Sequence, residues 1–268
     1  MRTPIINVMD RAARRAGRAL ARDFSEVQHL QASRKGTQKF SKAAIRKAKE
    51  IIKYELTKAR PSFNFLGEPI KPENSESKNE WIINPLDGAS NYAHGQPHFC
   101  ISIAHIDDKV LKESIVYDPL DEEIFWAVKN TGAYLNDTRL RVSARRDPSD
   151  SIIATFAQTD GKSENTPNPL SIIEIVQNYG DIRISGSPSL DLAYLAAGRF
   201  DGCYHQGLLP ENIGPGTLIV KEAGGLITDL NGKNNMLDSG DLIAANGELY
   251  DGLFNCIKSS NFSVSEDK

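Results

Sequence analysis

The sequence has only three cysteines among its 268 residues, Cys100, Cys203 and Cys256, and no two of them form a CxxC pair. Neither a disulfide framework nor a thiolate zinc site is therefore expected, and a reducing, cytoplasmic setting fits best. No apolar run reaches the length of a bilayer span. The first residues also lack the apolar core of a signal peptide. These absences predict a chain with neither a membrane span nor a secretion signal.

Two functional motifs are missing as well. A GxSxG elbow does not occur, which argues against a Ser-His-Asp nucleophile of the α/β-hydrolase kind. The basic residues are not interleaved with aromatic side chains in an RNA-binding motif, so specific readout of nucleic acid is not supported. No internal repeat is present, which leaves one large domain or two small ones.

Positive charge is concentrated near the N-terminus. Residues 1–60 hold 16 Lys and Arg against 5 Asp and Glu, whereas residues 61–268 hold 16 against 30. Two interpretations remain open at this point. The basic side chains are either the solvated faces of helices, or a surface that meets phosphate, RNA or an acidic partner protein.

Periodicity and turn residues predict a mixed α/β chain. Thr3 and Pro4 are typical of a helix start, and this helix is expected to run to about residue 22. A loop is predicted at 33–37, followed by a helix over 41–58. Further strands are predicted at 99–106, 112–117, 123–128, 152–156 and 182–184, and further helices at 169–178, 188–197, 213–223 and 247–258.

The stretch NPLDGASN, residues 84–91, follows the apolar run Trp81–Ile83 and is a candidate chemical site. Together with Glu68 and Asn212, Asp87 could supply oxygen ligands to Mg²⁺, which prefers about six of them. An isolated Asp beside a Gly is, however, usually just a turn former. The residues alone leave both interpretations open.

The order of four segments resembles the inositol monophosphatase family, in its bacterial SuhB branch. These are LGEP at 66–69, WIINPLDGASNYAHGQPHFCISIA at 81–104, VYDPLDEEIFWAVKNTGAYLND at 116–137, and the region from Gly186 to Gly232 that contains PENIGPG and EAGG. The resemblance covers roughly residues 4–258.

The resemblance implies a layered αβαβα sandwich, a homodimer, and Mg²⁺-dependent hydrolysis of an inositol or sugar phosphomonoester. It also implies an N-terminal half over residues 1–145 and a C-terminal half over 146–258. The last ten residues, 259–268, are expected to form a flexible tail. The SuhB branch offers a precedent for a transcription-machinery or RNA partner.

Site roles follow from the same resemblance. The metal positions are Glu68, Asn84, Leu86 through its carbonyl, Asp87 and Asn212. The phosphate-binding turn corresponds to Gly88, Ala89 and Ser90, and a substrate-side turn to Gly186 and Ser187. His205 stands where many relatives place a Glu that contacts the sugar hydroxyls.

Several of these positions depart from the family pattern. Asn84, Asn212 and Ile45 stand where the family has Asp, and Ala89 stands where a Thr orients the attacking water. Lys39 also replaces an acidic position, and with Lys42 it either binds an anion in place of the missing cations or is simply solvated. The substitutions predict a pseudoenzyme with a binding or regulatory role. The alternative is an atypical but functional Mg²⁺-dependent inositol-1-monophosphatase.

Overall fold

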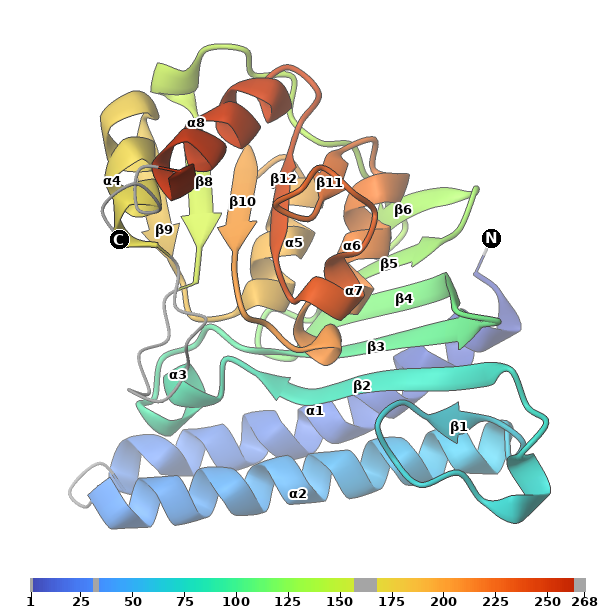
Figure 1. Ribbon diagram of the computed structural model, residues 1–268. Helices are drawn as coiled ribbons and strands as arrows, with labels where there is room; N and C mark the ends of the chain where they lie inside the picture. The colour runs from blue at the N-terminus through green and yellow to red at the C-terminus, as the bar shows by residue number, and fades with distance from the viewer. Residues whose placement is uncertain (1, 31–33, 157–167, 263–268) are drawn as a thin grey trace.

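A computed structural model describes residues 2–30, 34–156 and 168–262 and has five layers (Figure 1). Helices α1 (Pro4–Leu30) and α2 (Arg34–Ala59) cover one face of a seven-stranded sheet. Helices α5 (Pro188–Ala196) and α6 (Pro210–Glu222) lie between this sheet and a five-stranded one. Helices α4 (Pro169–Asn178) and α8 (Tyr250–Phe262) cover the outer face of the second sheet. The predicted αβαβα sandwich is confirmed.

The seven-stranded sheet has its strands in chain order, and the five-stranded sheet has the order β11-β12-β10-β8-β9. The first contains β1 (Asn64–Phe65), β2 (Asn79–Asp87), β3 (Cys100–Asp107), β4 (Val110–Asp118), β5 (Glu123–Val128), β6 (Gly132–Leu135) and β7 (Thr138–Arg139). The second contains β8 (Ile152–Thr155), β9 (Asp181–Ile184), β10 (Gly202–His205), β11 (Leu226–Thr228) and β12 (Leu242–Ala245). The short helices are α3 (Ala89–Ala93) and α7 (Met236–Ser239), with 3-10 turns at Pro72–Asn74 and Pro148–Asp150.

Helix α1 begins where the sequence predicts but continues further. The Thr3 hydroxyl accepts the backbone N–H of Ile6 at 3.1 Å, which confirms the predicted N-cap. The helix does not stop near residue 22, because Phe24 and Val27 continue the buried apolar stripe that Leu20 carries.

The loop predicted at 33–37 is wrong from residue 34 onward, since α2 already begins at Arg34. A glycine inside a helix costs only about 1 kcal/mol relative to alanine, so Gly36 does not prevent the helix. Residue 33 lies outside the described residues. The tail predicted from residue 259 is likewise helical through Phe262, and Ser260 is buried with its hydroxyl 2.7 Å from that of Ser171. Residues 263–268 lie outside the described part.

The apolar core divides along the layers rather than along the chain. Trp81, Phe99 and Tyr92 fill the space between the two N-terminal helices and the first sheet. A second cluster joins Val116 and Phe125 of the first sheet to α5, α6 and the second sheet. The division into halves at residue 145 stays a prediction, because these halves share one apolar layer. Among the described helices, none combines the length and the apolar character that a bilayer crossing requires.

Candidate active-site cavity

A β-bulge in β2 creates the central feature of the site. Asn84 pairs with Ser102 of β3, and Asp87 pairs with Cys100, so three steps along β2 match two along β3. In a regular strand, residues three apart point to opposite faces of the sheet. The extra residue in the bulge lets the side chains of Asn84 and Asp87 meet, with Asn84 Nδ2 3.0 Å from Asp87 Oδ2.

A cavity of about 660 Å³ opens over this bulge, and most of the predicted site residues line it. The first motif contributes six neighbours, and two distant segments contribute the rest. The predicted residues in the lining are Asn84, Leu86, Asp87, Gly88, Ala89, Ser90, Gly186 and Asn212. The fold therefore brings together eight of the residues that the resemblance placed in one site, whereas Glu68, Ser187 and His205 are not in the described lining.

Asp87 is buried and surrounded by neutral hydrogen-bond donors. Its Oδ2 accepts the side-chain amides of Asn84 at 3.0 Å and Asn212 at 3.2 Å, and the Ser189 hydroxyl lies 3.0 Å from the same atom. Its Oδ1 accepts the Ser187 hydroxyl and the Ser189 backbone N–H. Burial raises the pKa of Asp87, and the bonds from Ser187, Asn212 and Ser189 oppose this rise.

The two asparagines present N–H groups, not oxygens, to Asp87. The Oδ1 atom of Asn84 accepts the backbone N–H of Leu86 at 3.3 Å, which fixes the opposite edge of the amide toward the carboxylate. An aspartate in this place could not donate such a bond, because an ionised carboxylate only accepts. The Asn84 and Asn212 side chains thus donate hydrogen bonds directly to Asp87. Carboxylates at these two positions would instead need a cation between themselves and Asp87.

The two turns beside Asp87 are held by backbone geometry and by Asn91. Gly186 has φ +83°, and a Cβ there would lie 3.0 Å from Asn91 Nδ2. This amide donates to the carbonyls of His98 and Ser185, both at 2.8 Å, and so ties the two motifs together. Ser187 is fully buried and bonds to Asp87, whereas the resemblance implied a contact with substrate.

Gly88 is required at the turn after β2, and its replacement gives a testable prediction. It has φ +83°, and a Cβ would lie 2.7 Å from the His98 carbonyl oxygen. Gly224 also has positive φ, +89°, but a Cβ there meets nothing within 4 Å. A residue with a Cβ in this backbone region costs about 1–3 kcal/mol. We expect Gly88→Ala to lose at least about 2 kcal/mol more unfolding free energy than Gly224→Ala, because only Gly88→Ala adds a backbone clash. Urea unfolding of both variants measures this, and equal losses would contradict it.

Glu68 is engaged by two lysines of α2. Its carboxylate pairs with Lys49 at 3.1 Å and with Lys53, which follows one helical turn later. Burial acts to raise the pKa of Glu68, but the hydrogen bonds and charges of Lys53 and Lys49 outweigh it, and the pKa lies below its ordinary value. Glu68 is not among the described residues that line the Asp87 cavity.

Lys39 and Lys42 were expected to replace the missing cations, but the lysines that pair with Glu68 are Lys49 and Lys53. Lys39 and Lys42 are exposed on α2 and do not line the cavity among its described residues. Ile45 is partly buried and packs against the first core cluster, as does Ala89 at the start of α3. A role for Lys39 and Lys42 in anion binding stays a prediction.

His205 is not among the described residues that line the cavity. It is fully buried on β10, and its Nε2 is 3.6 Å from Oδ2 of the equally buried Asp191. Burial lowers the pKa of His205 to about 3, so the ring is neutral at ordinary pH. Burial also raises the pKa of Asp191, against a hydrogen bond from Ser185. A contact between His205 and a sugar hydroxyl stays a prediction.

The residues present do not fit the Mg²⁺ site that the resemblance implies. Within the described residues, no three His, Cys, Asp or Glu side chains converge to hold a metal ion. The carboxylate of Glu68 forms ion pairs with two lysines, and the carboxylate of Asp87 accepts hydrogen bonds from amide and hydroxyl groups. Besides Asp87, Glu211 is the one acidic residue in the described lining of this cavity. We therefore assign no chemical step to a metal.

A profile of the inositol monophosphatase family matches residues 1–261. The chain belongs to this family. It is 40% identical over 253 residues to an inositol-1-monophosphatase of Rhizobium meliloti, which covers 94% of this chain and 95% of that one. It is 36% identical over 260 residues to the Nus factor SuhB of Pasteurella multocida, with 95% and 96% covered.

Solved structures of this inositol monophosphatase family have the same fold. The structure of the extragenic suppressor protein SuhB from Bartonella henselae matches with a TM-score of 0.85 and 37% identity, covering 96% of this chain and 99% of that one. An inositol monophosphatase from Anabaena matches with a TM-score of 0.80 and 26% identity, covering 95% of each chain.

Sequence reasoning missed three residues that surround the site, Ser189, Lys49 and Lys53. The Ser189 hydroxyl bonds to Asp87, and only the fold brings it there. Asn91 lies in the candidate stretch 84–91, but its role in joining the two turns was not predicted. Lys49 and Lys53 did carry a signal, since two lysines four apart share one face of a helix. The partner of that helix face, Glu68, is known only from the structure, in which the loop after β1 places it beside the two lysines.

Proposed function

We propose that this chain retains the fold and the cavity of its family, has lost metal-dependent phosphoester hydrolysis, and acts by binding. One observation carries the proposal. The Asn84 and Asn212 amides donate to Asp87 Oδ2 at 3.0 and 3.2 Å, so N–H groups point at the carboxylate where cations would have to approach. An N–H donor and a cation cannot occupy the same position beside one oxygen.

The lost charge supports the same conclusion. A carboxylate a few ångströms from a cation contributes on the order of 4 kcal/mol per unit charge at an effective dielectric of about 20. The side chains at positions 84, 212 and 45 are neutral, and the carboxylate of Glu68 is paired with two ammonium groups. Mg²⁺ binding is therefore proposed to be weak or absent at this site.

The attacking water would also lack an orienting group. Ala89 follows Gly88 at the cavity wall and has no hydroxyl to hold a water. Loss of one positioning group in proton transfer commonly costs about 10²–10⁴ in rate. Under this proposal a phosphorylated polyol or sugar can still occupy the cavity over Gly88, Ser90 and Gly186, but it is not turned over.

A role toward a macromolecular partner is a second candidate. Relatives about as similar as the phosphatases carry the name Nus factor, and exposed basic side chains follow α1 and α2, such as Arg15, Arg22 and Arg46. These features favour an acidic partner, such as RNA or part of the transcription machinery, although several of the arginines are paired with carboxylates. A homodimer and a cytoplasmic location remain predictions.

Metal binding and turnover test the proposal together. The wild-type chain and Asp87→Asn are titrated with Mn²⁺ and followed by electron paramagnetic resonance, and both are assayed on inositol 1-phosphate with Mg²⁺. We expect the same free Mn²⁺ signal and the same background turnover from the two proteins. Circular dichroism confirms that the variant is folded.

The opposite result would support the atypical phosphatase. If the wild type takes up Mn²⁺ and shows Mg²⁺-dependent turnover that Asp87→Asn lacks, neutral ligands suffice for catalysis and the binding-only role is wrong. The cavity would then be an active site in which Asp87 supplies most of the charge.

A further inference from the structure

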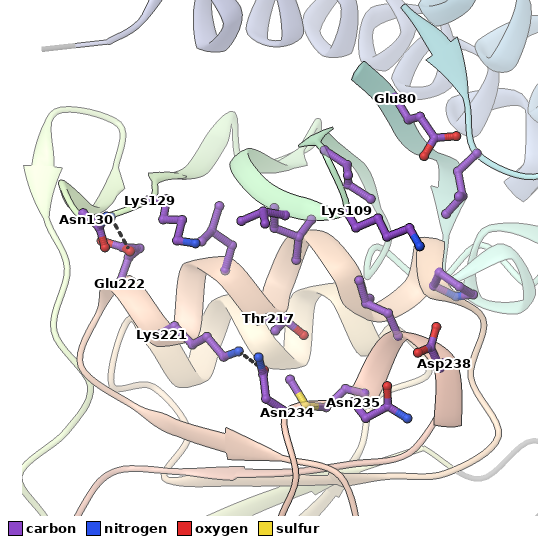
Figure 2. Close-up of a pocket in the computed structure, with 18 of the residues that line it drawn as sticks. Glu80, Lys109, Lys129, Asn130, Thr217, Lys221, Glu222, Asn234, Asn235 and Asp238 are labelled. Carbon is purple, nitrogen blue, oxygen red and sulfur yellow. Dashed lines mark hydrogen bonds between the residues drawn. The ribbon is translucent and has the colours of Figure 1, made fainter. Parts of the chain in front are cut away.

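A second and larger cavity lies between α6, the hairpin of β3 and β4, and the short helix α7 (Figure 2). It has a volume of about 920 Å³, in the range of small-molecule sites. Thr217 and Lys221 of α6 line it, while Asn212, more than a turn earlier on the same helix, lines the Asp87 cavity. The two cavities thus have no described lining residue in common.

The middle of this second cavity is apolar. The hairpin of β3 and β4 contributes Val110 and Leu111, helix α6 contributes Leu218, and the short helix α7 contributes Met236 and Leu237. Apolar walls of this extent bind the carbon skeleton of a ligand by removing it from water.

One end of the cavity carries two ammonium groups. Lys129, after β5, and Lys221 of α6 lie at the same end in Figure 2. Nζ of Lys221 donates to Oδ1 of Asn234, which holds it at the wall. The pKa of Lys221 is lowered by desolvation and by the charge of Lys129. An anion bound between the two groups would relieve this repulsion.

The acidic residues of the cavity do not neutralise the positive charge of Lys129 and Lys221 at that end. Glu222 is adjacent, but its carboxylate accepts three backbone N–H groups at the turn between β5 and β6, from Asn130 at 2.7 Å, Thr131 at 3.1 Å and Gly132 at 2.9 Å. Glu80 and Asp238 lie at the opposite end, together with Lys109 (Figure 2). The cavity therefore has a cationic end and a mixed end.

Thr217 lies between the two ends and has an unused hydroxyl. Its side chain is 2% exposed, and Oγ1 has no hydrogen-bond partner among the described residues. A buried hydroxyl is rarely left without a partner, because its desolvation is costly. Since Thr217 lines the cavity, a ligand atom can supply the missing partner.

We propose that this cavity binds a small organic anion. Its phosphate, carboxylate or sulfonate group lies between Lys129 and Lys221, its apolar body lies over Leu218, and a polar atom pairs with Thr217. This site does not depend on the proposed function of the Asp87 cavity, and it stands whether or not that cavity turns over a phosphomonoester.

The test uses the fluorescent naphthalene sulfonate ANS, which joins an anion to an apolar body, with the full chain. The Lys129→Met/Lys221→Met variant is compared with Lys71→Met/Lys258→Met, which removes two exposed lysines that do not line the cavity. We expect one saturable site in the wild type, with ANS bound about tenfold or more weakly by the cavity variant and unchanged in the matched control. Wild-type affinity in the cavity variant, or no saturable binding in the wild type, would overturn the proposal.

Thr217→Val separates a binding role from a structural one, because valine keeps the shape and removes the hydroxyl. We expect an equal or higher melting temperature without ligand, since an unpaired buried hydroxyl is gone. ANS affinity is expected to fall about fivefold, the effect of one hydrogen bond. A lower melting temperature with unchanged affinity would show that the hydroxyl serves the fold and would contradict its assignment to the ligand.

Discussion

A variant with four restored residues is expected to hydrolyse inositol 1-phosphate in Mg²⁺ at least about 100 times faster than the wild-type chain. The substitutions are Ile45→Asp, Asn84→Asp, Ala89→Thr and Asn212→Asp. Three of them return carboxylates, and the fourth returns a hydroxyl beside the cavity. The backbone needs no change at positions 84, 89 and 212, because all three already line the cavity over Asp87.

The controls for restoration follow from the same geometry. Adding Asp87→Asn to the restored variant should abolish the gain, since Asp87 lies between positions 84 and 212. Ile45 packs partly against the first core cluster, so a second version keeps Ile45 and carries only the other three changes. Turnover is measured against Mg²⁺ concentration. A folded variant that binds Mn²⁺ but remains inactive would show that the substitutions at 84, 89 and 212 are not what prevents hydrolysis.

The sequence predicted the location of the site better than its chemistry. Motif order was sufficient to bring Asp87, Gly186 and Asn212 into one cavity, because each follows a strand or begins a helix. The direction of the asparagine amides was not predictable in this way. Spacing alone would put the Asn84 and Asp87 side chains on opposite faces, and only the register shift against β3 brings them into contact.

The second feature that the sequence could not predict was which lysines pair with Glu68. The lysines at 39 and 42 were expected to replace cations because they occupy the stretch with missing acids. The structure shows Lys49 and Lys53 with Glu68 instead, about two and three helical turns beyond Lys42 along α2. Their partner lies in a loop after a two-residue strand, β1, which is too short to be predicted from alternation. Long amphipathic elements were predictable, and short strands and long-range ion pairs were not.

Asn84→Asp alone, without added metal, is expected to destabilise the chain by about 3 kcal/mol at neutral pH, which lowers the melting temperature by about 10 °C. The new carboxylate would lie at the place of an amide that now donates to Asp87 at 3.0 Å. Both groups are buried, with 6% of Asn84 and 1% of Asp87 exposed. Two ionised carboxylates at this distance repel each other, and the hydrogen bond is lost as well.

Lower pH should reduce this loss. The pKa of Asp87 is already raised by burial, so in the folded chain it takes up a proton at a higher pH than in the unfolded chain. Such a group destabilises the fold above its folded pKa, and the loss disappears as pH falls toward its unfolded pKa. A second carboxylate raises the folded pKa of the pair further. The difference in melting temperature between wild type and Asn84→Asp should therefore shrink as the pH is lowered.

Divalent cations should reduce the loss at constant pH, and this result would connect the stability of the site to its chemistry. A cation bound between two carboxylates stabilises the folded chain by about 2.7 kcal/mol at a concentration 100 times its Kd. We expect Mg²⁺ to raise the melting temperature of Asn84→Asp and to leave the wild type unchanged. Asn255→Asp, at an exposed position on α8, is the matched control for one added negative charge. If Mg²⁺ stabilises the wild type as much as Asn84→Asp, the amide at position 84 does not exclude the cation, and the site holds metal through neutral ligands.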